Sequence, residues 1–229
     1  MSEPALNYSL RQPLPAEVLV GGDAPWNRYQ RFPVFSRRWL AGRALVFGIV
    51  ILGFALLSGF GIAALTGQWQ RGAQVTALQG FAFFCMAMGG PALATWVRHR
   101  RWPGRRERSA VVLAVLLGMG TSFAVDRWAS NSINRTVRPE LVSAGVVTEK
   151  EPEMARGVRP LATAINLVLL AGIYGLLGGG VALRAYFREQ RRWQASQRAR
   201  ELRALREQKQ QADLRLGLLQ AQVEPHFLF

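Results

Sequence analysis

The chain has 229 residues, a formal net charge of +15 and one cysteine, and half of its residues are hydrophobic although its mean hydropathy is only +0.08. These values indicate apolar blocks that alternate with basic ones, which is typical of a multi-pass membrane protein and argues against a basic soluble protein that binds nucleic acid directly. A single cysteine (Cys85) excludes an intrachain disulfide, and with only two histidines (His99 and His226) we expect no metal site.

Residues 1–43 are polar and basic and lack the apolar core of a cleavable signal, so we expect a cytoplasmic basic arm. Beyond the arm, a membrane region at 44–187 contains four apolar runs of about the 20 residues that a spanning helix needs. The predicted spans are about 44–66, 73–97, 109–128 and 161–183. The second contains Gly89-Gly90-Pro91, where we expect a kink. The outer loop, about 129–160, is either a solvated connector or a short helix.

The charges between the spans predict the topology. The segments along the chain are basic, nearly neutral, basic, mixed and basic. Because basic residues concentrate on the cytoplasmic side, this alternation places both termini in the cytoplasm. We therefore expect a multi-pass protein of the bacterial inner membrane with an all-α fold.

A cytoplasmic helix is expected at 188–229. Its strong helix formers contain no glycine before Gly217 and no proline before Pro225. Apolar or small residues recur at heptad-like spacing, which predicts a coiled coil and a homodimer: Ala195, Leu202, Leu205, Ala212, Leu216, Leu219 and Val223. We expect the fourth span to continue into this helix as one rod of roughly 95 Å. Gly175 and Gly179 form a GxxxG step that suits either a dimer contact or packing inside one protomer.

The last eight residues, Gln222 to Phe229, read QVEPHFLF. Pro225 removes a backbone donor and should loosen the helix beside His226. A neutral imidazole is a competent nucleophile near neutral pH. A lone histidine in such a place is nevertheless most often an ordinary surface residue.

This string resembles the signature Q-[IV]-x-P-H-F-L-F-N of the LytS/YehU-type sensor histidine kinases, the family whose internal region carries the phosphoacceptor. The resemblance implies that His226 is the site of autophosphorylation. It implies that five neighbours support the motif: Gln222, Pro225, Phe227, Leu228 and Phe229. Glu224 occupies the variable position. The family's ATP-binding domain, which uses Mg²⁺, and a P-loop are both missing from these residues, so we expect the chain to be part of a longer protein and inactive as a kinase by itself.

The leading hypothesis is therefore the membrane sensor and phosphoacceptor portion of a two-component histidine kinase, a transferase that passes phosphate to a response regulator. The resemblance implies that this regulator can be of the LytTR type. The alternative is a non-catalytic membrane adaptor that interacts through its coiled coil. A transporter is disfavoured, because no acidic residue lies in the middle of a span.

Overall fold

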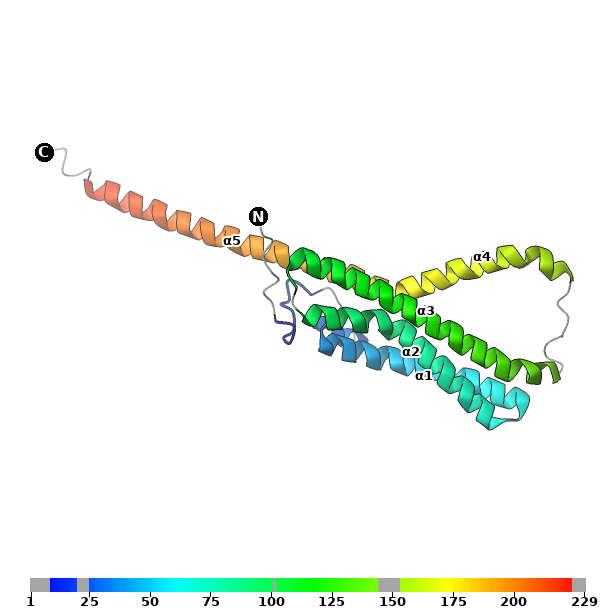
Figure 1. Ribbon diagram of the computed structural model, residues 1–229. Helices are drawn as coiled ribbons and strands as arrows, with labels where there is room; N and C mark the ends of the chain where they lie inside the picture. The colour runs from blue at the N-terminus through cyan, green and yellow to red at the C-terminus, as the bar shows by residue number, and fades with distance from the viewer. Residues whose placement is uncertain (1–8, 20–24, 101, 144–152, 224–229) are drawn as a thin grey trace.

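The computed structural model describes residues 9–19, 25–100, 102–143 and 153–223, and the described residues contain helices but no strand (Figure 1). The elements are a 3-10 helix η1 (Pro25–Arg31), α1 (Arg37–Thr66), α2 (Trp69–His99), α3 (Gly104–Ser143), α4 (Glu153–Gly175), a π-helical turn η2 (Leu176–Gly180) and α5 (Val181–Val223). Helices α1, α2 and α3 lie side by side, α4 diverges from α3, and α5 extends away from the bundle as a single helix (Figure 1).

Four helical segments are long and apolar enough to cross a membrane, and they are Arg37–Thr66, Trp69–His99, Gly104–Pro139 and Thr163–Leu219. This confirms the sequence prediction of four such helices and is consistent with a multi-pass membrane protein. Most large apolar side chains of α1 are exposed, as expected for a helix that faces lipid rather than water.

The first two of these candidate spanning helices form a tight hairpin. Ser36 caps the start of α1 by accepting a hydrogen bond from the Trp39 amide at 3.2 Å. Gly67 ends the helix with φ 69°, a left-handed conformation that glycine adopts without strain. A short turn then makes α1 and α2 antiparallel neighbours, with the rings of Phe60 and Trp69 5.9 Å apart.

The expected single rod through the fourth span is wrong at one point. The chain stays helical from α4 into α5, but Gly179 has φ 137° and ψ −6°, and Figure 1 shows that the two helices point in different directions. Three consecutive glycines, Gly178 to Gly180, are poor helix formers and permit this backbone. Of the two glycines in the GxxxG step, Gly179 packs inside the protomer and also carries the non-helical backbone, whereas a Cβ at Gly175 would meet no described atom within 4 Å.

The segment expected as an outer loop is largely helical. Helix α3 continues to Ser143 and α4 already begins at Glu153, which favours the helical alternative over a solvated connector. Arg71 at the start of α2 donates a hydrogen bond to the Thr136 carbonyl at 2.8 Å, so this extension of α3 is tied to the bundle.

The core lies at the end of the bundle where α5 begins. Val34, Phe35 and Trp39 from the N-terminal part are buried there against residues of α2, α3 and α5. Phe35 is fully buried and its ring lies 5.7 Å from that of Tyr186 on α5. Part of the predicted basic arm is therefore a packing element and not merely a charged tail.

Helix α2 runs through Pro91 as one element, and its axis changes direction along its length in Figure 1.

Helix α4 packs little against the other helices. Its apolar side chains Ile165, Leu167 and Val168 are more than half exposed. Its main contact with α3 lies near its end, where Tyr174 packs edge-on against Phe123.

Candidate functional site

The sequence-predicted site falls largely outside the described residues. His226, Pro225, Phe227, Leu228 and Phe229 lie in the segment 224–229, for which the structure gives no placement. Gln222 belongs to the last turn of α5. What the structure does describe is the helix that leads to this motif and the way its other end is held.

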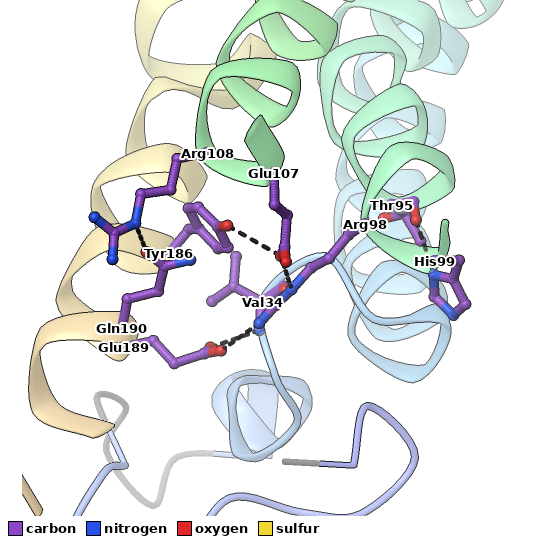
Figure 2. Close-up of polar contacts among 9 residues, drawn as sticks. All are labelled: Val34, Thr95, Arg98, His99, Glu107, Arg108, Tyr186, Glu189 and Gln190. Carbon is purple, nitrogen blue, oxygen red and sulfur yellow. Dashed lines mark hydrogen bonds and ion pairs between the residues drawn. The ribbon is translucent and has the colours of Figure 1, made fainter. Parts of the chain in front are cut away.

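A buried polar cluster holds that other end, and we call it the junction network: Val34, Arg98, Glu107, Arg108, Tyr186, Glu189 and Gln190. Figure 2 shows how these side chains from α2, α3, α5 and the N-terminal segment converge. Arg98, only 3% exposed, is its centre. Its Nη2 lies 3.1 Å from Glu189 Oε1, and its Nε lies 3.6 Å from Glu107 Oε1. One guanidinium on α2 therefore links α3 to α5.

Glu189 also fastens the N-terminal segment to α5. Its Oε2 accepts a hydrogen bond from the Val34 amide at 2.7 Å, and Arg98 donates to the Val34 carbonyl. Glu189 is fully buried, so its charge depends on these partners for stabilisation. Both polar groups of one backbone residue are thus satisfied by a single ion pair between α2 and α5.

Tyr186 and Arg108 complete the network. The Tyr186 hydroxyl donates to Glu107 Oε1 at 3.2 Å, and its ring lies 4.9 Å from the Arg98 guanidinium carbon. Arg108 Nε donates to Gln190 Oε1 at 2.8 Å. Burial, with the nearby Glu107 carboxylate as a second cause, raises the pKa of Tyr186 above its ordinary value. A phenol is protonated at neutral pH even with its ordinary pKa, so Tyr186 acts as a hydrogen-bond donor here.

The N-terminal segment follows α5 beyond this cluster. Arg192 donates to the Leu19 carbonyl, and Arg200 lies 3.6 Å from Glu17 in an exposed ion pair. The exposed pair adds little stability. The segment nonetheless contacts the first five turns of α5, which makes a rotation of that helix dependent on the N-terminal segment.

A second buried arginine lies deeper in the bundle. Arg43 on α1 is 5% exposed, and its Nε and Nη2 each lie 3.4 Å from the Ala87 carbonyl. Pro91 has no N–H, so that carbonyl lacks its usual partner four residues on. Arg43 Nη2 also donates to the Leu177 carbonyl in η2 at 2.7 Å. A single side chain thus satisfies backbone at both helix irregularities, at Pro91 and beside Gly179.

Glycines allow the π-helical turn η2 to pack closely against α2 and α3. A Cβ at Gly179 would lie 2.8 Å from Val115 Cγ1, and one at Gly118 would lie 2.5 Å from the Gly90 Cα. In contrast, a Cβ at Gly175 would meet no atom of the described chain within 4 Å. The backbones of α2, α3 and η2 therefore approach each other closely, as small residues at helix interfaces permit.

From the sequence alone, Arg43 and Arg98 are two of the positive charges of the basic segments that we expect on the cytoplasmic side. Two signals could have identified the junction network and the site of Arg43. Glu107 is the only acid in the basic segment 98–108, and Glu189 is the only acid in the basic segment 184–193. An isolated acid in a strongly basic stretch is a candidate buried partner, and Pro91 marks a carbonyl that requires another donor.

Comparisons with known proteins add no assignment: no family model, curated protein or solved structure matches the chain. Within the part of the chain that the structure describes, no group of three or more His, Cys, Asp or Glu side chains could hold a metal ion. The two features of the chain that bear on its function are the motif at 222–229 and the junction network at the base of α5.

Proposed function

We propose that the chain is the membrane sensor and phosphoacceptor portion of a two-component histidine kinase of the bacterial inner membrane, with both termini in the cytoplasm. The observation that carries the proposal is the string QVEPHFLF at the far end of α5. The junction network supports it, because a helix whose base is clamped to three other segments is suited to transmit a change in the bundle.

In this proposal His226 accepts a phosphoryl group on an imidazole nitrogen and later passes it to an aspartate of a response regulator, which can be of the LytTR type. The resemblance to the kinase family implies that ATP and Mg²⁺ would be bound by a separate catalytic domain. Phosphoryl transfer depends on positioning. A change in the angle of α5 would therefore alter the rate at His226.

A homodimer through α5 is part of the proposal. Leu202, Leu205, Leu216 and Leu219 of the predicted seam are each more than half exposed. An exposed apolar seam on a long helix favours pairing with another helix. The same seam supports the alternative, a non-catalytic adaptor, because a partner protein could cover it.

Phosphate labelling separates the two candidates. In membranes that contain the protein with its downstream region, we expect ATP to give an acid-labile, base-stable phosphate that His226→Gln abolishes. His99→Gln changes the other histidine of the chain and should label normally, because the His99 ring forms a hydrogen bond with the Thr95 carbonyl of its own helix, far along the sequence from the motif. Labelled His226→Gln protein would refute the site, and an unlabelled wild type would favour the adaptor.

A further inference from the structure

A groove lies between the start of α3 and the start of α5. Its volume is about 420 Å³, and six residues line it: Arg108, Ser109, Val112, Leu113, Leu116 and Phe187. Arg108 and Ser109 form its polar end. The other lining residues of α3 are apolar and follow toward the interior of the span. The groove therefore changes from charged to apolar along α3, at the point where the basic segment meets the apolar run.

The rim of the groove is strongly basic. Arg105 precedes Arg108 by one helical turn, and Arg184 and Arg191 lie three residues before and four residues after Phe187. All three of these additional arginines are exposed. Two helices thus bring positive charge to one opening, which gives it an electrostatic preference for an anionic group.

We propose that this groove binds an anionic phospholipid. Its phosphate would contact the Arg108 guanidinium, and one acyl chain would lie along Val112 and Leu116. The Ser109 hydroxyl donates to the Arg105 carbonyl at 3.3 Å and would exchange this long hydrogen bond for one to the phosphate. Basic pockets between membrane helices suit anionic headgroups. A soluble anion would make no contact with the apolar part of the groove. A zwitterionic lipid would gain less from the positive charge of the rim than an anionic one. The inference depends on the proposed membrane orientation but not on phosphorylation of His226.

The site is connected to the junction network. Arg108 Nε donates to Gln190 on α5, and Gln190 directly follows Glu189, the partner of Arg98. A phosphate bound by Arg108 would therefore connect the headgroup layer, α3 and α5. The content of anionic lipid around the protein would then influence how firmly α5 is held.

Native mass spectrometry of the full chain in detergent tests the site. The probes are phosphatidylglycerol and phosphatidylcholine with identical acyl chains. We expect at least about fivefold tighter binding of phosphatidylglycerol, the effect of roughly one arginine at a headgroup. Arg108→Gln should reduce this preference to within about twofold. Arg100→Gln is the matched control, because it removes the same charge from an exposed arginine that stacks on Trp96 of α2.

A groove-filling variant and a competition experiment complete the test. Val112→Trp fills the groove without changing any charge, and it should weaken binding of phosphatidylglycerol about fivefold even if Arg108→Gln fails to fold. Glycerol phosphate at millimolar concentration should not displace the lipid. Equal losses in Arg108→Gln and Arg100→Gln, binding unaffected by Val112→Trp, or displacement by glycerol phosphate would each overturn the proposal. His226→Gln should keep the lipid preference, which separates this test from that of phosphorylation.

Discussion

Arg98→Met is expected to lower the free energy of unfolding by about 3–5 kcal/mol. The substitution leaves the fully buried Glu189 carboxylate with the Val34 amide but without its ion-pair partner. It also removes the donor to the Val34 carbonyl. Denaturant unfolding in mixed micelles, followed by tryptophan fluorescence, measures the change, and the melting temperature should fall on the order of 10 °C.

Two variants test the physical reason for this loss. Arg105→Met removes an exposed arginine from the same basic segment and should stay within about 0.5 kcal/mol of wild type. Arg98→Met combined with Glu189→Leu removes both charges and should be more stable than Arg98→Met alone. If the two single arginine variants unfold at the same denaturant concentration, the junction network does not stabilise the base of α5.

Gly118→Ala should destabilise the helix bundle by about 1–3 kcal/mol. The added methyl group would lie 2.5 Å from the backbone N and Cα of Gly90, and rigid backbone cannot move aside as a flexible side chain can. Separation of α2 and α3 would also disturb η2, which packs against both. Thermal unfolding in detergent micelles gives the measurement.

Gly120→Ala is its matched control. Gly120 lies on the same helix two residues later, and a Cβ there would meet no described atom within 4 Å. This change should be neutral or stabilise α3 by up to about 1 kcal/mol through helix propensity. Equal melting temperatures for the two alanine variants would contradict the close backbone contact.

The number and order of the four helices long and apolar enough to span a membrane could be predicted from the sequence, because uncharged runs of spanning length separate basic segments. The residues at which these helices begin and end could not be predicted. Helix α1 begins at Arg37 and α3 continues to Ser143, since a helix does not stop where hydrophobicity does. Charged residues near a span continue the helix when capping and packing support it.

The break at Gly179 and the buried arginines were beyond sequence reasoning for a different reason. Consecutive glycines permit a positive φ but do not require one, and the Arg43 contact with Leu177 in η2 is what stabilises this geometry. Whether an arginine near a span lies in the headgroup region or inside the bundle depends on acceptors from distant segments. Arg43 illustrates this dependence through Ala87 and Leu177, which lie 44 and 134 residues away in the chain. Arg98 does so through Val34 and Glu189, 64 and 91 residues away, in addition to the nearby Glu107.

In the proposed function, the junction network controls the imidazole of His226, which follows α5 in the sequence. The rate of phosphate incorporation at His226, located by peptide mapping, tests this control in bilayers that contain the chain joined to a kinase catalytic domain. Glu189→Gln should lower this rate more than tenfold, because α5 loses the ion pair that fixes its base. Glu201→Gln, an exposed acid on the same helix, should stay within twofold of wild type. Phosphate on another residue, or equal rates in both variants, would contradict the account.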